Sequence, residues 1–505
     1  MSVSSTPIVL TTLNARYIHS ALGLRYLYAN MGSLTPQTQI KEFTLEQRSI
    51  DIVEQLLLLN PSIIGFGIYI WNVAASVEVI QILRNVRPEI KIIIGGPEVS
   101  YEISQQPLLS WVDHLICGQA DVEFPQLCQN ILNQTPALEK IIYAETPQLQ
   151  QLELPYDAYS QEDIAHRIIY VEASRGCPFK CQFCLSALDK TAWPFDQAKF
   201  LSAMKNLYDK GVRHFKFVDR TFNLNIKACE NILDFFIQRL GDGLFLHFEL
   251  IPDHLPEALK TKIQCFPEGV LQFEIGIQSL NQEVQQRIQR KQNMQKVTEN
   301  LVWLLTSSKA HLHTDLIIGL PGETLQSLAQ GFNQLYSLGP HEIQVGILKR
   351  LKGTPITQHD HNFEMVYSPV APFNLLSNKD LNFEVMQRLN RFARYWDMIA
   401  NSGRFKHCLK LLLQETPFED FLKLSDALFV RTNQTHQIAL RRLFVLLYEL
   451  GQAEFELDLD QFKHVLQQDY QRAGLKGIPP FDSRYHEPIQ QQNKNSANRR
   501  QQQHQ

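Results

Sequence analysis

The chain has 505 residues, of which 44 % are hydrophobic and 20 % are charged. This composition excludes a disordered chain, and the length predicts about three domains. The 48 Lys and Arg residues nearly balance the 52 Asp and Glu residues, so the net charge of −4 predicts no general attraction to nucleic acid or to an anionic membrane. The eight cysteines lack the even spacing of a secreted disulfide scaffold, and the start of the chain lacks a signal-peptide pattern. We therefore expect a soluble cytoplasmic protein with reduced thiols.

Residues 1–135 alternate short apolar runs with amphipathic stretches. The strand-like runs are PIVLTTL, TQIKEF, PSIIGFGIY, KIIIGG and DHLICG, and the stretches between them carry apolar residues at helical spacing. This alternation predicts an α/β fold, with a Rossmann-like parallel sheet covered by helices on both faces. The most apolar stretch is too short for a membrane span, which needs about 20 apolar residues. Residues 136–165 have scattered prolines and no sustained period, which predicts a linker.

Residues 166–365 return to the same alternation. Their strand-like runs are RIIYVEA, HFKFVD, LFLHFEL, LQFEIGI, HLHTDLIIGL and EIQVGIL, with helical stretches between them. Repeated βα units predict a partial TIM barrel, (β/α)6, although periodicity alone does not separate a partial barrel from an open sheet. Functional residues of such barrels lie at the carboxyl ends of the strands.

The strand pattern is absent from residues 366–476, which predicts an all-helical domain there. The first expected helix ends before Gly403, and a second helix, IALRRLFVLLYELG, is expected to stop at Gly451. One apolar stripe of the first helix consists of Leu381, Val385, Leu389, Phe392 and Trp396. Residues 477–505 are rich in Gln and Asn, which predicts a disordered tail.

Three cysteines, Cys177, Cys181 and Cys184, follow the first strand of the predicted barrel with the spacing C-x3-C-x2-C. Thiolates are soft ligands that suit zinc, copper(I) or iron–sulfur clusters. A structural zinc site commonly uses two separated cysteine pairs, whereas this chain has no second pair. A 4Fe–4S cluster held by three thiolates keeps one iron free for a substrate or a cofactor. The alternatives are a zinc site completed by His166 or His214 and a set of buried structural cysteines.

This spacing, with Phe183 directly before the last cysteine, resembles the signature of the radical S-adenosylmethionine (radical SAM) superfamily. The resemblance implies that the three cysteines bind a 4Fe–4S cluster and that S-adenosylmethionine binds the open iron, with Phe183 beside the adenine. In that family an electron from the cluster cleaves S-adenosylmethionine to a 5′-deoxyadenosyl radical, which removes hydrogen from a substrate.

Two later segments, FEIGIQS and DLIIGLPGET, resemble the fourth and fifth barrel strands of the same superfamily. The residues that they add to the expected S-adenosylmethionine site are Gln278, Ser279, Gly319 and Glu323. Each short motif is weak alone, because the glycines also suit tight turns. Asp219 and Arg220 follow the second strand at the same edge, where an ordinary charged loop explains them equally well.

The N-terminal domain lacks the G-x-G-x-x-G motif of dinucleotide-binding domains. Gly95 and Gly96 at a strand end allow close approach of a large ligand, or serve turn geometry alone. Together with the radical SAM signature, the segments TLNARYIHSALGLRYL, IIGFGIYIWN, GGPEVSYE and CGQADVEF resemble the cobalamin-binding domain of a radical SAM subgroup. The chain lacks the D-x-H-x-x-G motif of some cobalamin proteins and has GQAD where the subgroup commonly has GEGE. The residues that the resemblance places near cobalamin are Asn14, Tyr17, His19, Gly95, Gly96 and Gly118.

The whole arrangement resembles radical SAM proteins that have an N-terminal vitamin B12-binding domain and a C-terminal helical domain of unknown function. The resemblance implies an enzyme that uses a 4Fe–4S cluster, S-adenosylmethionine and cobalamin to methylate an unreactive carbon of an unknown substrate. It also implies an electron donor such as ferredoxin or flavodoxin. The alternatives are a radical rearrangement without methylation and a non-catalytic iron–sulfur or zinc module. The related methylthiotransferases carry three further N-terminal cysteines, whereas only Cys117 and Cys128 precede the trio here.

Overall fold

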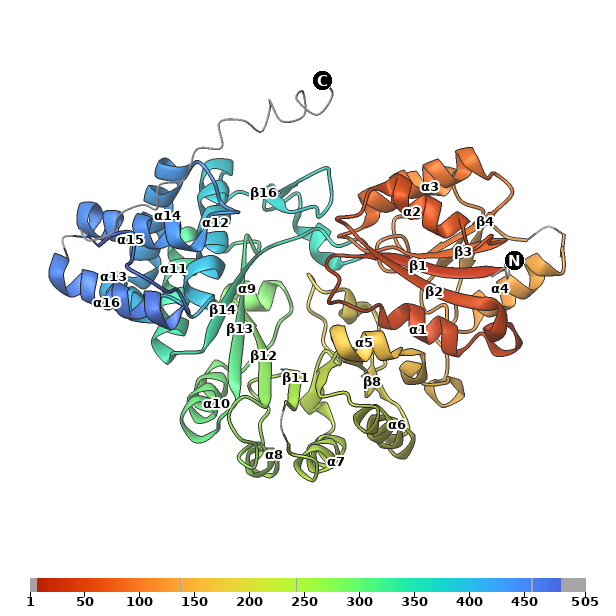
Figure 1. The fold of residues 1–505 in the computed structure, drawn as a ribbon, viewed down its shortest axis with the longest axis horizontal. Coiled ribbons are helices and arrows are strands. Elements are labelled where there is room, and N and C mark those ends of the chain that lie inside the picture. Colours follow the sequence, from red (N-terminus) through yellow and green to blue (C-terminus); the bar gives the residue numbers. More distant parts are fainter. Residues whose placement is uncertain (1–6, 137, 242, 456, 483–505) are drawn as a thin grey trace, which may run out of the picture. The chain divides into compact units, whose positions relative to one another are not determined.

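The computed structural model describes residues 7–136, 138–241, 243–455 and 457–482. The chain divides into one compact unit, Met1–Met386, and a second, Gln387–Gln505, and each is described by itself. The ribbon of the chain is drawn in Figure 1. None of the helices formed by the described residues is long and apolar enough to cross a membrane.

The first sheet is parallel throughout and has the strand order β2-β1-β3-β4-β5-β6. Its strands are β1 (Ile8–Asn14), β2 (Thr38–Thr44), β3 (Ile63–Gly67), β4 (Lys91–Gly95), β5 (His114–Cys117) and β6 (Ile141–Tyr143). The five strand-like runs of the sequence are therefore confirmed as β1 to β5. The sixth strand comes from the segment that the sequence predicts as a linker, so part of that segment extends the sheet.

Helices cover both faces of this sheet, as its apolar strands require (Figure 1). They are α1 (Leu22–Ala29), α2 (Ser49–Leu57), α3 (Val73–Val86) and α4 (Glu123–Leu132). All seven residues of β1 are buried, and alternate residues enter two separate cores. Val9 packs in the core that includes α2 and α3, whereas Ile8 packs in the core that includes α1 and α4. The strand order reverses at β1, and ligands of such sheets bind beyond the carboxyl ends of the strands.

The second sheet has six parallel strands in chain order, which confirms the predicted (β/α)6 partial barrel. The strands are β7 (Ile169–Val171), β10 (His214–Phe217), β11 (Phe245–Leu250), β12 (Leu271–Gln278), β13 (His311–Ile318) and β14 (Glu342–Ile347). Burial alternates along β12 and β13, because one side of each strand packs under the helices. Among the described strands β7 and β14 form the two edges, so the barrel is open.

Helices lie along the outside of the second sheet, where α6, α7, α8 and α10 are visible in Figure 1. The helices of this part are α5 (Gln161–His166), α6 (Gln197–Asp209), α7 (Ile226–Ile237), α8 (Glu257–Ile263), α9 (Gln282–Arg287), α10 (Met294–Ser307) and α11 (Leu325–Leu338). Two small antiparallel pairs complete the strands: β8 (Ser174–Arg175) with β9 (Trp193–Pro194), and β15 (Val366–Tyr367) with β16 (Leu375–Ser377). Short 3-10 turns span Gly32–Gln37, Ile103–Gln105, Pro107–Ser110, Leu149–Gln151, Pro155–Ala158, Leu185–Leu188, Phe222–Leu224 and Pro355–His359.

The described part of the second unit is helical, as predicted. The start of the predicted helical segment 366–476 is a correction, because β15 and β16 pair there as two short antiparallel strands. The elements of the second unit are α12 (Phe383–Trp396), which begins in the first unit, a π-helical turn (Asp397–Asn401), α13 (Lys406–Leu412), α14 (Pro417–Thr432), α15 (Leu440–Glu454) and α16 (Leu459–Arg472). Phe392 of the predicted apolar stripe packs on Phe418 and Phe421, with ring centroids 4.8 and 5.2 Å away. Such buried aromatic contacts stabilise a small helical core.

One helix end was predicted wrongly. Helix α15 continues through Gly451 to Glu454 instead of stopping at the glycine. A Cβ atom at Gly451 would lie 2.2 Å from the Phe462 ring of α16, so the glycine allows close helix packing. The predicted disordered tail lies largely outside the described residues, since the description ends at residue 482.

The Gly451→Ala variant is expected to destabilise the helical unit by about 1–3 kcal/mol, because the added methyl group overpacks the contact with Phe462. Thermal unfolding followed by circular dichroism would measure the decrease in the melting temperature. The double variant Gly451→Ala/Phe462→Leu should recover part of the loss, and the exposed control Gln452→Ala should show none. An unchanged melting temperature for Gly451→Ala would contradict this packing account.

Candidate active site

The loop that carries the three cysteines is held at its base by hydrogen bonds. Asp219 accepts from the backbone N–H of Ala173 at 2.9 Å and from Oγ of Ser174 at 2.6 Å. The backbone N–H of Cys177 donates to the carbonyl of Asp189 at 2.8 Å. Gly176 has a φ of 92°, and a Cβ atom there would lie 2.7 Å from Oγ1 of Thr191. The loop therefore closes on itself just before the first cysteine.

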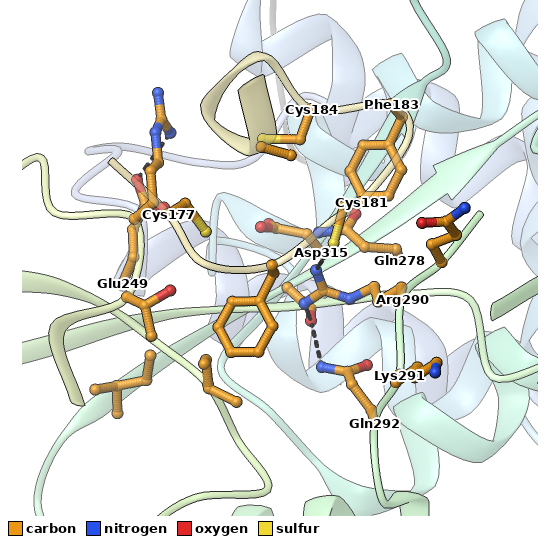
Figure 2. Close-up of a pocket in the computed structure, with 18 of the residues that line it drawn as sticks. Cys177, Cys181, Phe183, Cys184, Glu249, Gln278, Arg290, Lys291, Gln292 and Asp315 are labelled. Carbon is orange, nitrogen blue, oxygen red and sulfur yellow. Dashed lines mark hydrogen bonds and ion pairs between the residues drawn. The ribbon is translucent and has the colours of Figure 1, made fainter. Parts of the chain in front are cut away.

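The three cysteines line one cavity of about 240 Å³ at the carboxyl ends of the barrel strands, as Figure 2 shows. Cys177 and Cys181 are buried, and burial raises the pKa of both thiols. Nη1 of Arg290 donates to Sγ of Cys181 at 3.5 Å, which partly opposes the rise in the pKa of Cys181. Metal binding replaces the thiol proton, so these neutral thiols become thiolate ligands when a cluster binds.

Polar atoms without partners surround the same cavity. Nε of Arg290 and Oε1 of Gln292 are buried and have no hydrogen-bond partner among the described residues. Oδ1 of Asp315 also lacks a hydrogen bond there, but it lies 3.6 Å from Nε2 of His313. Buried polar atoms are nearly always paired, so the two atoms of Arg290 and Gln292 in one cavity indicate a polar ligand. Figure 2 shows Arg290, Gln292 and Asp315 with the cysteines around this space. The residues present therefore fit a polar molecule bound beside a cluster.

Two carboxylates of this cavity have opposite environments. Burial, together with the neighbouring carboxylates Glu274 and Glu249, raises the pKa of Asp315 to about 8. Burial alone would raise the pKa of Glu274 too, but His247, which lies within hydrogen-bond distance of it at 3.0 Å, helps to lower that pKa to about 2. At neutral pH the cavity thus holds a protonated carboxyl group close to an ionised one.

The structure brings two of the expected S-adenosylmethionine residues to the cavity, Phe183 and Gln278. Gln278 has a φ of 70° at a β-bulge that ends β12, a distortion that redirects side chains. Ser279, Gly319 and Glu323 do not line the cavity. Glu323 instead accepts hydrogen bonds from Ser279 and Ser327, so it braces the turns that follow β12 and β13. The proposed role of these three residues in binding remains a prediction.

The alternative zinc site receives no support from the geometry. His166 lies in α5 and His214 at the start of β10, and neither lines the cavity. Among the residues that the structure describes, no three His, Cys, Asp or Glu side chains are grouped around a single metal position. In a cluster each thiolate binds a different iron, so three cysteines spread around one cavity suit a cluster better than a single ion.

A second cavity, of about 210 Å³, lies at the carboxyl ends of β3, β4 and β5. Its glycines are Gly23, Gly65, Gly67, Gly95, Gly96 and Gly118. Gly96 serves turn geometry, because its φ is 112° and a Cβ atom would lie 2.4 Å from the carbonyl oxygen of Ile68. Gly95 differs, since a Cβ atom there would approach only the carbonyl oxygen of Ile116, at 3.3 Å. A group that enters this cavity can therefore approach the backbone at Gly95 closely.

The other residues expected near cobalamin do not line this cavity. Nδ2 of Asn14 donates to Glu42 at 3.0 Å. The hydroxyl of Tyr17 donates to Glu162 at 2.7 Å, and Nδ1 of His19 lies 2.8 Å from the hydroxyl of Tyr170. All three contacts fix the loop after β1, and those of Tyr17 and His19 tie it to the chain around α5 and β7. Their proposed role at cobalamin remains a prediction.

Several residues that line the barrel cavity were not predicted as site residues from the sequence. Glu249 and Asp315 occupy alternate, inward positions of β11 and β13, and polar residues at alternate positions of a barrel strand could have indicated them. Arg290 follows α9 in a short connection that carries no recognisable signal. Only the fold brings it to Cys181.

Known protein families match the parts of the chain that carry the two cavities. Residues 8–127 match the B12 binding domain family, residues 171–334 match the Radical SAM superfamily, and residues 361–505 match a protein family of unknown function, DUF4080. The chain therefore matches a B12-binding domain and, after it, a radical SAM domain. Its cofactors are a 4Fe–4S cluster, S-adenosylmethionine and cobalamin.

Among curated proteins, "Uncharacterized methyltransferase PH0819" of Pyrococcus horikoshii is 23 % identical, over 61 % of this chain and 71 % of that protein. "Cobalamin-dependent radical SAM methyltransferase TokK" of Streptomyces tokunonensis is 22 % identical over 58 % of this chain. The match spans 48 % of TokK, about half of its length. Among solved structures, the cobalamin-dependent S-adenosylmethionine radical enzyme OxsB has a TM-score of 0.64 at 12 % identity, over 94 % of this chain and 82 % of that chain. This similarity shows a shared fold.

Each of the variants Cys177→Ala, Cys181→Ala and Cys184→Ala is expected to lose the visible absorbance of the reconstituted cluster. The fold should remain, because the thiols lie on a loop at the cavity and not in an apolar core. Anaerobic reconstitution with iron and sulfide, followed by absorbance and iron analysis, measures the effect. The exposed Cys265, which does not line the cavity, provides the control variant Cys265→Ala. Full iron content in any of the three cavity variants would contradict the assignment.

Asp219 should make stability depend on pH, because burial raises its pKa to about 7 from an ordinary value of 3.8. Between these values the folded protein retains a proton that the unfolded chain has lost. The free energy of unfolding therefore falls as pH rises, by about 1.4 kcal/mol per pH unit for one full proton, and levels off above the folded pKa.

The Asp219→Asn variant lacks this titration, so its unfolding free energy should decline less between about pH 5 and 7 than that of the natural protein. Equilibrium chemical denaturation at several pH values measures both slopes. The exposed Asp157→Asn variant serves as the control and should keep the natural slope. Equal slopes for Asp219→Asn and the natural protein would show that the carboxyl group at position 219 is ionised in the fold.

Proposed function

We propose that this chain is a cobalamin-dependent radical SAM methyltransferase that acts on an unreactive carbon. The observation that carries the proposal is the presence, in one compact unit, of a cavity lined by three cysteines and a cavity lined by glycines. A bound cluster with S-adenosylmethionine supplies a carbon radical, and cobalamin supplies a methyl group. The names of PH0819 and TokK, both methyltransferases, support the same reaction.

The residues of the chain have distinct parts in this reaction. Cys177, Cys181 and Cys184 hold the cluster and leave one iron without a protein ligand. Phe183 and Gln278 line the space beside it, where they bind and orient S-adenosylmethionine. The protonated Asp315 and the ionised Glu274 offer a hydrogen-bond donor and an acceptor to a polar substrate in the barrel.

We propose the electron donor and the location from the chemistry of the site. Reduction of the cluster needs a low-potential protein donor, for which ferredoxin or flavodoxin is our proposal. The cysteines are free thiols in the structure, which suits a reducing compartment such as the cytoplasm.

The test uses the full chain, reconstituted anaerobically and supplied with S-adenosylmethionine, hydroxocobalamin and a low-potential reductant. We expect formation of both 5′-deoxyadenosine and S-adenosylhomocysteine, because radical formation and methyl transfer give different products of the same cofactor. Formation of 5′-deoxyadenosine alone would favour a radical rearrangement and contradict methyl transfer. Neither product would contradict catalysis and leave a non-catalytic cluster module.

The variant Gly95→Leu separates the two cofactor sites. Gly95 lines the cavity and has no positive φ, and an added Cβ would lie 3.3 Å from the carbonyl oxygen of Ile116, so a small shift of that strand accommodates the side chain while it fills the cavity. We expect at least a tenfold loss of cobalamin retention and of S-adenosylhomocysteine, with 5′-deoxyadenosine retained. Gly241→Leu, at an exposed position remote from both cavities, is the matched control. Unchanged cobalamin content in Gly95→Leu would contradict the placement of the cobalamin site.

A further inference from the structure

The turn Gly118–Asp121 follows β5 and forms part of the wall of the second cavity. Gly118, Gln119 and Asp121 line that cavity, together with Arg175 from the cysteine loop. Three residues of this turn, Gln119, Ala120 and Asp121, depart from the G-E-G-E pattern of similar domains, whereas Gly118 matches it. The departure places one amide and one carboxylate at the contact between the N-terminal domain and the barrel.

Asp121 and Gln119 both bind Arg175, which lies two residues before Cys177. Nη1 of Arg175 donates to Oδ2 of Asp121 and to Oε1 of Gln119, each at 3.0 Å. The other edge of the guanidinium group faces Glu172 at 3.3 Å, and its plane lies 4.6 Å from the centre of the Tyr26 ring. The side chain of Arg175 is only 14 % exposed, so this ion pair is shielded from solvent.

Gln119 also holds the opposite end of the cysteine loop. Its Nε2 donates to Oδ2 of Asp189 at 2.9 Å. The carbonyl of Asp189 accepts from the backbone N–H of Cys177, and its Oδ1 accepts from the backbone N–H of Thr191. One turn of the N-terminal domain thus binds the chain on both sides of the three cysteines.

We infer that the turn Gly118–Asp121 couples the two cofactor sites, with Gln119 and Asp121 as positioning residues. The side chains that line the cobalamin cavity are the same ones that clamp the cysteine loop. A group that fills this cavity restrains the turn and, through Arg175 and Asp189, restrains the loop that binds the cluster. Coupling of this kind is reciprocal, so each cofactor increases the affinity of the protein for the other.

A second ion pair between the same two domains provides a matched control. Glu98, which follows β4, pairs with Lys352, which follows β14, at 2.9 Å. Glu98 is buried and Lys352 is half-buried. Neither residue lines either cavity or contacts the cysteine loop. Loss of this pair by Glu98→Gln weakens the contact between the domains but leaves the clamp on the cysteine loop intact.

The experiment measures the affinity for hydroxocobalamin by absorbance titration, once with the reconstituted cluster and once after a chelator has removed it. The natural protein should bind hydroxocobalamin about fivefold more tightly, or better, when the cluster is present. In the reciprocal measurement, hydroxocobalamin should slow the release of iron to a chelator by a similar factor. In Gln119→Leu/Asp121→Asn, the ratio of the affinities with and without the cluster should fall to about one, and so should the ratio of the iron-release rates without and with hydroxocobalamin. In Glu98→Gln both ratios should stay at the natural value.

Equal affinities with and without the cluster in the natural protein would overturn the inference, as would failure to bind hydroxocobalamin at all. So would a double variant that keeps the natural factors, or a Glu98→Gln variant that loses them, since either result assigns the effect to domain contact in general. Thermal unfolding confirms that each variant is folded, and the single variant Asp121→Asn replaces the double variant if that does not fold. The inference rests on the proposed placement of cobalamin in the second cavity, but no step uses methyl transfer, so a failure of methyl transfer would leave the coupling intact.

Discussion

Three thiols must be held at the edge of a sheet by a loop that has little regular structure of its own. The loop meets this constraint through buried polar contacts at fixed points. Asp219 holds its start, Asp189 closes its base, and the backbone N–H of Gln182 donates to the carbonyl of Ile288 in the middle of the cysteine set. Arg175 adds a link to the N-terminal domain. The geometry of the proposed cluster site therefore depends on partners that are distant in sequence.

The walls of the two cavities differ in their chemistry. The wall of the N-terminal cavity is largely backbone and apolar side chains, and the glycines at its strand ends let a ligand approach the backbone closely. The barrel cavity instead carries charged and polar side chains, among them Glu249, Glu274 and Arg290. Its unpartnered atoms and its carboxyl groups of different pKa suit binding and orientation of polar molecules.

Periodicity in the sequence predicted nearly all of the parallel strands, because each buried strand is a contiguous apolar or alternating run. The sequence also predicted the three cysteines as metal ligands, since all three lie within eight residues of chain. Contacts between distant segments were not visible. Arg290 donates to Cys181 from a distant segment, and Gly451 lies inside its helix, where it allows close packing against Phe462 of α16. The sequence places Asn14, Tyr17 and His19 near the end of the first strand, but it does not reveal that their side chains contact Glu42, Glu162 and Tyr170.

The central claim is that the protein supplies three ligands to a four-iron cluster and leaves the fourth iron to a small molecule. Mössbauer spectroscopy of the iron-labelled, oxygen-protected protein tests this claim directly, with spectra taken before and after addition of S-adenosylmethionine. The account predicts a cubane spectrum in which one iron site of the four changes its isomer shift when the molecule binds. A spectrum that S-adenosylmethionine leaves unchanged, or protein that contains zinc in place of iron, would contradict it.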